Sequence, residues 1–596
     1  MSRILSISAS VHDSGIALID SGNVICAFEE ERFKRLKGIF NQFSFPELSL
    51  KELHKQFGIT PFDEDVIVVM SKPIVCGLDY LEKILQFKEI YLYEHHDCHA
   101  ATAYLLSGFN EETLVLTYDA GDSNGIEERV LTLDVLQKIR DQKLPVRKTQ
   151  IPEEEYIKVM ASIKKNDGTA PCQLWMPEGS YIMDKKLIED SCSISYHIGK
   201  NNSFHNSTYI KGTHTLASFW DFYCGLNGLF GGRDEGKILG LSSQGKFNQM
   251  IFDAVGKFFK FEENLKWDHV HEVNDFFSKL DLKNDMQLRK DSAFMVQKFS
   301  EQYMLELVDW LKKQNPNATK LALAGGFFSN VKVNQVINEY SSFDEIFIAP
   351  GMGDGGLALG AALLHANKLG EFQTQKINHV FWGSHMDLSF STVGYYEAPF
   401  NEDFISDCLI SGKVIGIFNG RREWGPRALG STSIIFDATN PESHNFINER
   451  LDRNDEMPFA PIVLEGQESK VFHCYKSKYA AKFMTLCYTV KDQWRERIPG
   501  VVNKYDNTSR IQIVDYLNNP FHDILSSYYL KTGIPVLMNT SFNVHGEPII
   551  NTPEQAFGHL KSGVIDYLVV GSKIFRNPNE SELNTQNLNL DNIFQV

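Results

Sequence analysis

The sequence repeats one strand–turn–strand pattern on either side of a histidine-rich segment, and this repeat limits the folds open to the chain. In the first copy, residues 4–8, 16–19 and 24–28 are apolar strands, and the turn between the first two reads VHDSG. In the second copy, the apolar strand 113–118 runs into the bend DAGD, and we expect residues 129–133 to be the returning strand. Such a bend directs backbone N–H groups and a carboxylate into one space, which suits a phosphate and a metal ion. The repeat predicts a duplicated nucleotide-binding α/β fold.

The segment between the two copies, Glu94–Ala100, reads EHHDCHA. In a helix, His95 and His99 lie one turn apart on the same face, which suits two nitrogen ligands of zinc or a transition metal. The alternative is a helical histidine pair that binds no ion, since such pairs are common. Cys98 lies between them, and we interpret it as a small buried residue rather than as a ligand.

Two acidic bends supply the remaining ligands that such a site needs. Asp119 follows the strand 113–118, and Asp354 lies in the loop APGMGDGG before a small-residue helix at 357–364. Together with the histidines they offer two nitrogens and two carboxylate oxygens. This set suits iron(II), manganese or zinc, whereas magnesium alone does not favour two imidazoles.

Other segments complete the first half of the chain. The strand 321–324 runs into Gly325 and Gly326, and a helix is predicted after them, so a nucleotide's sugar or phosphate could approach bare backbone there; a packing turn is the alternative. The charged stretch 29–37 is interpreted as a solvated helix face. Residues 140–210 are polar and irregular and are interpreted as an insertion.

Composition excludes some classes of function. The 596 residues carry 59 basic and 76 acidic side chains, a formal net charge of −17, which argues against general nucleic-acid binding. An anionic substrate such as ATP must therefore be held by a local cluster. The nine cysteines have no C-x-x-C spacing, and we expect them to be reduced. With no apolar run of signal-peptide or membrane-spanning length, the sequence predicts a cytoplasmic protein that does not bind membranes.

Composition changes near residues 366–380, where a second αβ region is predicted to begin. Its motif NGRREWGPRALG places Arg421, Arg422 and Arg427 in a rigid Gly/Pro frame. Guanidinium groups fit phosphate oxygens bidentately, so we expect a phosphate site; surface arginines are the alternative. In NTSFN, Ser541 and Asn543 lie on the same side of the backbone and could bind one polar group.

The sequence resembles the O-carbamoyltransferase family of the nodulation-factor, cephamycin and nebramycin type, which tailors natural products. The matching stretches span nearly the whole chain in the family's order; they are SASVHDSGIAL, EEERFKRLK, EHHDCHA, LTYDAGD, DEGKILGLSSQG, LALAGGFFSNVKVN, APGMGDGGLALGAAL, NGRREWGPRALG, MPFAPIV and NTSFN. The resemblance implies an actin-like ATPase (ASKHA, Kae1-like) domain at 1–370, with an insertion at about 135–230. It implies a YrdC-like twisted αβ domain at 371–596.

The resemblance also implies an enzyme, a transferase of one-carbon groups that works in two steps. The YrdC-like domain would form carbamoyladenylate from carbamoyl phosphate and ATP, which comes with Mg²⁺. The Kae1-like domain, with iron(II) or else manganese or zinc, would transfer the carbamoyl group to a hydroxyl of a small-molecule or nucleobase-type acceptor. A homodimer is implied by the resemblance alone.

Family roles carry over onto matching positions of this sequence. The metal ligands fall on His95, His99, Asp119 and Asp354. His12 matches the family's general base, for which an imidazole pKa near neutrality is suited; a turn histidine is the alternative. The expected nucleotide-binding residues are Gly325, Gly326 and Asn330. The positions expected around carbamoyl phosphate and ATP are Arg421, Arg427, Arg510, Ser541 and Asn543.

Two positions depart from the family pattern. Thr432 lies in GSTS where many relatives have a basic residue, and Asp452 stands where a lysine often precedes the F-A-P motif. Two lost cations would cost several kcal/mol of phosphate binding, at roughly 1.5–3 kcal/mol for each charged hydrogen bond. Arg450 or Arg453 could substitute for the missing lysine.

Two other functions compete with this one. A tRNA-modifying carbamoyl-transfer relative would use the same domain types, but the acidic balance argues against it. A non-catalytic actin-like module that only binds nucleotide is the other, and His12 beside four candidate metal ligands argues against that.

Overall fold

The computed structural model describes most of the chain. The described residues are 2–10, 13–37, 44–74, 76–122, 128–141, 192–212, 215–229, 231, 234–263, 267, 269–387, 389–453, 459–474, 476, 478–518 and 520–577. The chain forms two compact units. Unit 1 comprises residues 1–34, 38–377 and 475–479, and unit 2 comprises 35–37, 378–474 and 480–596. The main division at 377/378 lies close to the predicted boundary at 370/371.

Unit 1 contains two mixed sheets that share one strand order. The first sheet has the order β3-β2-β1-β4-β5-β7 and the second the order β11-β10-β6-β8-β9. The first consists of β1 Arg3–Ser8, β2 Gly15–Asp20, β3 Asn23–Glu29, β4 Val66–Ser71, β5 Ile90–Tyr93 and β7 Val130–Leu131. The second consists of β6 Thr113–Asp122, β8 Cys192–Lys200, β9 Ser203–Lys211, β10 Lys320–Ala324 and β11 Glu345–Ile348.

The shared order reveals the predicted duplication. In each sheet a central strand, β1 or β6, pairs antiparallel with the first strand of a hairpin and parallel with a later strand. One part of the prediction was wrong. The strand that returns beside β6 is β8, whereas residues 130–131 form β7 and pair with β5 in the first sheet. The interpretation of 140–210 as irregular was therefore also wrong for 192–211, which form the β8–β9 hairpin.

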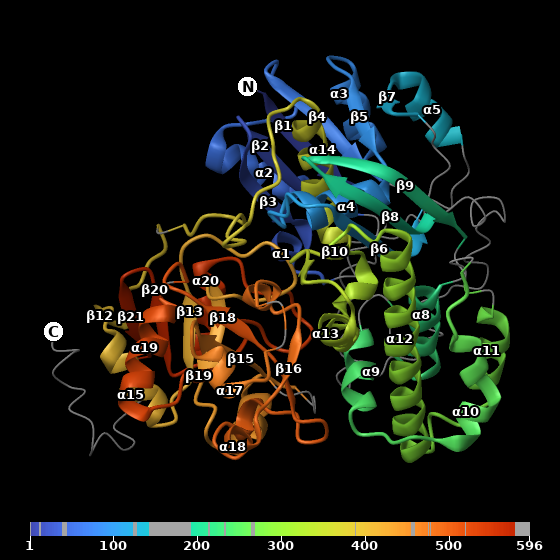
Figure 1. The fold of residues 1–596 in the computed structure, drawn as a ribbon. Coiled ribbons are helices and arrows are strands. Elements are labelled where there is room, and N and C mark those ends of the chain that lie inside the picture. The colour runs from blue at the N-terminus through green and yellow to red at the C-terminus, as the bar shows by residue number, and fades with distance from the viewer. Residues whose placement is uncertain are drawn as a thin grey trace. The chain divides into compact units, whose positions relative to one another are not determined.

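Helices pack against these sheets and form a separate group beside the second sheet (Figure 1). Those associated with the sheets are α1 Glu30–Lys34, α2 Glu47–Phe57, α3 Leu78–Leu85, α4 His95–Leu105, α5 Leu133–Asp141 and α14 Leu357–Lys368. The group comprises α8 Leu216–Leu226, α9 Glu235–Ser242, α10 Gln249–Val255, α11 Val270–Ser278, α12 Met286–Gln314 and α13 Val331–Tyr340. Short 3₁₀ helices lie at Gly256–Phe259 (η3), Gly326–Ser329 (η4) and Asp354–Gly356 (η5).

The contact between α4 and α14 explains the small residues of the second helix. A Cβ atom on Gly360 would lie 2.1 Å from the carbonyl oxygen of Cys98, so only glycine allows the helices to approach this closely. The α14 helix is buried along almost its whole length. The loop that carries Asp354 is thereby held against the helix that carries the two histidines.

The charged stretch at 29–37 is not a solvated face, contrary to the prediction. Glu30 and Arg32 are buried. The Glu30 carboxylate accepts hydrogen bonds from the backbone N–H groups of Leu48 and Ser49 in the first turn of α2. It therefore satisfies donors that have no partner within the helix.

Unit 2 is built on one mixed sheet of eight strands, in the order β12-β21-β20-β13-β14-β19-β15-β18. Its strands are β12 Tyr396–Pro399, β13 Ile415–Phe418, β14 Thr432–Phe436, β15 Ala460–Leu464, β18 Gln512–Val514, β19 Val536–Ser541, β20 Tyr567–Val570 and β21 Lys573–Arg576, with a separate pair, β16 Cys487–Thr489 and β17 Thr508–Arg510. Its helices are α15 Glu402–Ile410, α16 Ser443–Arg450, α17 Glu468–Val471, α18 Asp492–Arg495, α19 Phe521–Thr532 and α20 Pro553–Lys561, with 3₁₀ helices η6 Ala480–Phe483 and η7 Pro499–Val501. Within the described ranges, no helix has both the length and the apolar character needed to cross a bilayer.

Candidate metal centre and anion site

Four side chains from three parts of unit 1 converge on one point. His95 and His99 lie on the first turns of α4, Asp119 lies on β6, and Asp354 begins η5. The Nε2 atoms of the two histidines are 3.1 Å apart. One candidate ligand atom from each of the four residues lies within 4.8 Å of all the others. The structure thus brings together the four residues that the sequence singled out.

The spacing and chemistry of this cluster fit one metal ion. Asp119 Oδ2 lies 3.3 Å from His99 Nε2, and Asp354 Oδ1 lies 3.6 Å from Nε2 of each histidine. Ligands placed about 2.1 Å from a common ion stand about 3.0–3.5 Å apart, so little movement is needed for binding. The donor set of two imidazoles and two carboxylates is one that zinc, manganese or iron(II) accepts.

The electrostatics of the cluster also favour a cation. Burial alone would lower the pKa of His99, but hydrogen bonds and charge attraction from Asp119 and Asp354 outweigh it and raise this pKa to about 9. The same contacts hold the pKa of Asp119 below its usual range, despite the burial that opposes ionisation. The Asp119 carboxylate is therefore charged at neutral pH, and a proton on His99 occupies the place that an ion would take.

The paired glycines after β10 support Asp119. The backbone N–H of Gly326 donates a hydrogen bond of 2.7 Å to Asp119 Oδ2. Gly325 has φ of 103°, and a Cβ atom there would lie 2.2 Å from the carbonyl oxygen of Tyr118. Asn330, another predicted nucleotide-binding residue, caps α13 by accepting hydrogen bonds from the N–H groups of Lys332 and Val333. The described contacts of these three residues are thus within the protein.

The residues between the two histidines are also held in place by burial and hydrogen bonds. His96 is buried, and burial lowers the pKa of its ring to about 3, so the ring is neutral. The Asp97 carboxylate accepts a 2.6 Å hydrogen bond from the hydroxyl of Tyr209 on β9. The α4 segment is therefore fixed to the β8–β9 hairpin through side chains that are not themselves ligands.

In unit 2, a buried carboxylate that the sequence analysis missed organises the loop 419–431. Glu423 Oε1 accepts hydrogen bonds from the N–H groups of Leu429, Ser431 and Thr432, at 2.6–3.0 Å. Its other oxygen accepts a 2.6 Å hydrogen bond from the Thr432 hydroxyl. The signal that could have revealed it is an acid in a Gly- and Pro-rich loop between arginines.

Arg427 and Arg510 form a pair of cations without an acidic partner among their described contacts. Burial lowers the pKa of Arg427 to about 10. Burial and the nearby charge of Arg427 lower the pKa of Arg510 well below its usual value. Arg427 Nε and Arg510 Nη2 are buried with no hydrogen-bond partner in the described structure. Two half-buried guanidinium groups that repel each other favour the binding of an anion.

A network of amides joins the segments that carry these two arginines. The side chain of Gln512 donates to the carbonyl of Leu429, and that of Asn539 donates to the carbonyl of Ala428. These contacts join the loop 419–431 to the strands β18 and β19, which are both part of the large sheet. In the sequence, Arg427 is adjacent to Ala428, Arg510 lies two residues before Gln512, and Ser541 lies two residues beyond Asn539.

The structure distinguishes between the two arginines that could replace the missing lysine. Arg453 donates hydrogen bonds to Thr540 Oγ1 at 3.0 Å and to Ser541 Oγ at 3.3 Å. Arg450 instead pairs with Asp566, at 3.1 Å. Arg453 therefore lies beside the predicted anion-binding serine, whereas Arg450 is engaged elsewhere in unit 2.

The other three predicted residues are Arg421, Asn543 and His12. Arg421 donates to the carbonyls of Trp382 and Gly383, and the amide of Asn543 donates to the carbonyls of Val544 and Glu547, so their described hydrogen bonds go to the backbone. His12, the predicted general base, lies outside the described residues.

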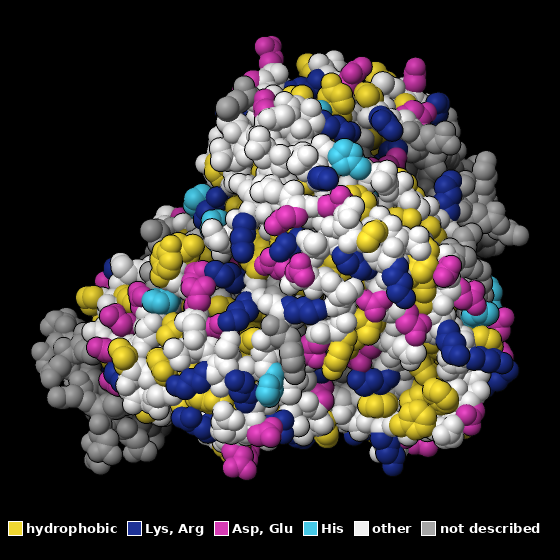
Figure 2. Space-filling view, viewed as in Figure 1, with side chains coloured by type: hydrophobic (Ala, Val, Ile, Leu, Met, Phe, Trp, Pro, Cys, Tyr) yellow, Lys and Arg dark blue, Asp and Glu magenta, His cyan; other side chains and the backbone are white. Residues whose placement is uncertain are grey.

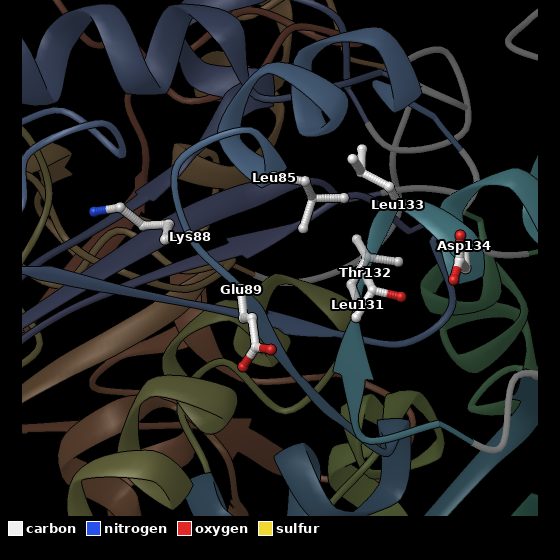
Figure 3. A pocket seen from close by; sticks show the side chains of 7 residues that line it. All are labelled: Leu85, Lys88, Glu89, Leu131, Thr132, Leu133 and Asp134. Atoms are coloured by element: carbon white, nitrogen blue, oxygen red, sulfur yellow. The ribbon is translucent and has the colours of Figure 1, made fainter.

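A separate pocket lies between the end of α3 and the turn from β7 to α5 (Figure 3). It is lined by Leu85, Lys88, Glu89, Leu131, Thr132, Leu133 and Asp134. The ammonium group of Lys88 donates hydrogen bonds to the backbone carbonyls of Asp63 and Val66, so it stabilises the local fold. On the face drawn in Figure 2, basic and acidic side chains are interspersed.

Comparison with known proteins identifies two family models along the chain. Residues 182–363 match the model of the carbamoyltransferase N-terminus, and residues 406–577 match that of the carbamoyltransferase C-terminus. Together they cover more than half of the chain.

Individual relatives cover still more of it. Nodulation protein NolNO of Sinorhizobium fredii is 25% identical over 617 residues, which cover 95% of this chain and 79% of that protein. An uncharacterized protein of Methanocaldococcus jannaschii is 30% identical over 393 residues, 62% of this chain and 74% of its own length. Among solved structures, HypF of T. kodakarensis is 17% identical and covers 30% of this chain and 23% of its own, with a TM-score of 0.21.

Proposed function

This chain belongs to the carbamoyltransferase family and is a carbamoyltransferase, and from that premise we propose that it is an O-carbamoyltransferase with two separate reaction centres. Unit 2 forms carbamoyladenylate from carbamoyl phosphate and ATP. Unit 1 transfers the carbamoyl group to a hydroxyl of a small-molecule or nucleobase-type acceptor. In this scheme unit 1 has an actin-like, Kae1-like fold, and unit 2 a YrdC-like fold.

The first step takes place at the arginine pair. Carbamoyl phosphate loses its phosphate with consumption of one water molecule, and the carbamate oxygen attacks the α-phosphorus of ATP, which releases pyrophosphate. Arg427 and Arg510 bind the phosphate oxygens and compensate the negative charge that grows on the departing groups. Arg453 and Ser541 are hydrogen-bonded to each other and contribute further polar groups in unit 2. ATP brings Mg²⁺ into the same step.

The second step takes place beside the four converging ligands of unit 1. His95, His99, Asp119 and Asp354 would hold iron(II), manganese or zinc, which when bound supplies positive charge to the phosphate side of the adenylate. The acceptor hydroxyl attacks the carbamoyl carbon, the bond to the AMP oxygen breaks, and the hydroxyl proton passes to a base, for which we propose His12. The buried α4 segment excludes water from one side of this centre.

The observation that best supports the proposal is that Arg427 and Arg510 have no acidic partner among their described contacts. Burying two like charges is costly unless a ligand compensates them, so such a pair indicates an anionic substrate. Glu423, by contrast, is saturated by four donors and acts as scaffold.

The test is isotope exchange between ATP and labelled pyrophosphate in the presence and absence of carbamoyl phosphate. We expect exchange that depends on carbamoyl phosphate in the wild type and in Arg497→Ala, a matched control in which an exposed arginine of unit 2 is removed. Arg510→Ala should lose exchange. A His95→Ala/His99→Ala double variant should retain exchange and lose metal. No exchange in the wild type at any carbamoyl phosphate concentration would rule out the first step.

The acceptor can be sought directly in cells. Small molecules and DNA from cells with and without the gene should differ by species that have gained one carbamoyl group, detected by mass spectrometry. Such a species should disappear when the wild-type gene is replaced by the Arg510→Ala variant.

A further inference from the structure

A line of hydrogen bonds runs from the edge of the second sheet of unit 1 to the residue next to a metal ligand. Its last member is His96, which is buried between the candidate ligands His95 and His99 on α4. His96 Nδ1 lies 2.5 Å from Thr117 Oγ1, and its Nε2 lies 2.9 Å from the carbonyl oxygen of Cys192. His96 therefore joins α4 to both β6 and β8.

The line continues through β8 to β9. Thr117 Oγ1 lies 2.7 Å from Ser195 Oγ, and Ser195 Oγ lies 2.9 Å from His197 Nε2. His197 Nδ1 lies 2.8 Å from Ser207 Oγ on β9. The register between β8 and β9 shifts around His197, and an irregularity of this kind can redirect a side chain.

One carbonyl group sets the direction of every hydrogen bond in this line. A carbonyl can only accept, so the Nε2 of the neutral His96 ring carries the proton and its Nδ1 must accept. Thr117 uses its one hydroxyl proton for that bond. Ser195 must then donate to Thr117.

The same reasoning extends to the surface. Because the Ser195 proton is already used, Ser195 Oγ accepts from the Nε2–H of His197, and the neutral His197 ring accepts at Nδ1 from the Ser207 hydroxyl. All the bonds point the same way, so the His96 ring has one tautomer and one orientation. A reversed ring would leave the buried threonine hydroxyl and the carbonyl wrongly paired.

His96 lies on the same turn of α4 as the two histidine ligands. His95 and His96 are consecutive, and His99 lies three residues further on in the same helix, so a rotation or shift of this turn moves both ligand rings. The hydrogen bond from Tyr209 to Asp97 holds the same turn from β9. Two neighbouring residues of the helix are thus attached to one hairpin.

We propose that His96 is a positioning residue for the metal centre, and that the Ser207–His197–Ser195–Thr117 line fixes its ring so that His95 and His99 present their Nε2 atoms 3.1 Å apart. This inference rests on the metal centre of the proposed function. It assigns a task to the β8–β9 hairpin, which contributes no ligand of its own to the cluster.

The test measures metal binding separately from folding. Co²⁺ affinity and the Co²⁺ visible absorption spectrum are recorded for wild type, His96→Leu, His96→Gln and Thr117→Val, and thermal unfolding is followed in chelator. We expect His96→Leu to bind Co²⁺ about 10–100-fold more weakly with an altered spectrum, as is usual when a residue that orients metal ligands is lost. His96→Gln, which keeps a donor and an acceptor, should recover most of the affinity.

Two further variants keep the outcome decisive. If His96→Leu does not fold, Thr117→Val, which is nearly isosteric and breaks the line one step away, should still weaken Co²⁺ binding. Ser203→Ala is the matched control, because Ser203 is exposed on the same strand, β9, and is not a member of this line. If folded His96→Leu or Thr117→Val had the Co²⁺ affinity and spectrum of the wild type, and only a lower unfolding temperature, the positioning role of His96 would be refuted. The metal centre itself would not be affected by that result. Absence of Co²⁺ binding by the wild type would overturn the metal centre itself.

Discussion

Neutralising Arg427 should make unit 2 more stable while it abolishes adenylate formation. Burial lowers the pKa of Arg427 from the ordinary arginine value to about 10. At 1.36 kcal/mol for each pH unit, this corresponds to about 3.4 kcal/mol against the charged side chain in the folded state. Because the Arg427 side chain is partly exposed, solvent screening reduces this destabilisation of the folded state to about 1–3 kcal/mol. The sign follows from the direction: a base whose pKa falls on folding destabilises the fold while it stays charged.

Arg427→Met is the suitable change because it keeps most of the side-chain volume and removes the charge. A gain of 1 kcal/mol raises the unfolding temperature of a unit of this size by about 2–4 °C, so a gain of about 1–3 kcal/mol should raise it by roughly 2–12 °C. The assay is calorimetry on the full chain, with and without inorganic phosphate, alongside the pyrophosphate exchange assay. Phosphate should stabilise the wild type and should have little effect on Arg427→Met.

The control is Arg422→Met, which removes a buried arginine that is already bonded to the carbonyls of Asn419 and Gly420 and lies over the ring of Phe418. That variant should be less stable than the wild type. A fall in stability of Arg427→Met together with unchanged protection by phosphate would refute the reasoning that Arg427 is an uncompensated, anion-binding cation.

Three further outcomes follow from the described contacts. Glu423→Gln should lower the free energy of unfolding of unit 2 by about 2–4 kcal/mol, measured by denaturant titration, because an amide cannot accept from all four donors. The rate of ATP–pyrophosphate exchange should fall as well. His99 without metal has a pKa of about 9, so a metal ion must displace its proton. The Mn²⁺ affinity measured by titration should therefore rise by up to about tenfold per pH unit until pH 9 and then level off. An affinity that stays constant from about pH 6 to 9 would contradict this. Arg453→Ala should raise the KM for carbamoyl phosphate, and its neighbour Arg450→Ala should leave that KM unchanged; equal effects would remove the distinction between the two.

The metal cluster was predictable because it depends on regularities that a sequence displays. The i, i+4 spacing of His95 and His99 fixes their common face once the segment is a helix. Asp119 directly follows the apolar run 113–118, although it lies within β6 rather than in the predicted bend, and Asp354 stands in the loop after β11. Both positions lie toward the carboxyl ends of their strands, where neighbouring strands bring side chains close together. Local pattern and strand order were therefore enough to bring four distant residues to one point.

Pairings across long gaps were not predictable. Residues 129–133 have the pattern of a returning strand, yet only Val130–Leu131 is a strand and it pairs with β5. The actual partner of β6, beginning at Cys192, follows a long intervening segment, and loop length carries little information about which strands meet.

The sequence also cannot separate a ligand-binding polar group from one that supports the scaffold. Arg421 and Arg427 stand in the same motif, but the first donates to backbone carbonyls and the second retains an unpaired nitrogen. Glu30 and Glu423 are carboxylates whose acceptors are filled by backbone N–H groups of segments that only the fold brings near. The sequence shows that such residues are charged, but it does not show which hydrogen-bond donors and acceptors surround them in the fold.

The most direct measurement is anomalous X-ray diffraction from crystals of the full chain, collected on either side of the absorption edges of iron, manganese and zinc, with metal content determined by plasma mass spectrometry. We predict one transition metal per chain, bound by His95 Nε2, His99 Nε2 and carboxylate oxygens of Asp119 and Asp354. An anomalous peak elsewhere, or metal-free protein that takes up none of these ions at these four residues, would contradict the account.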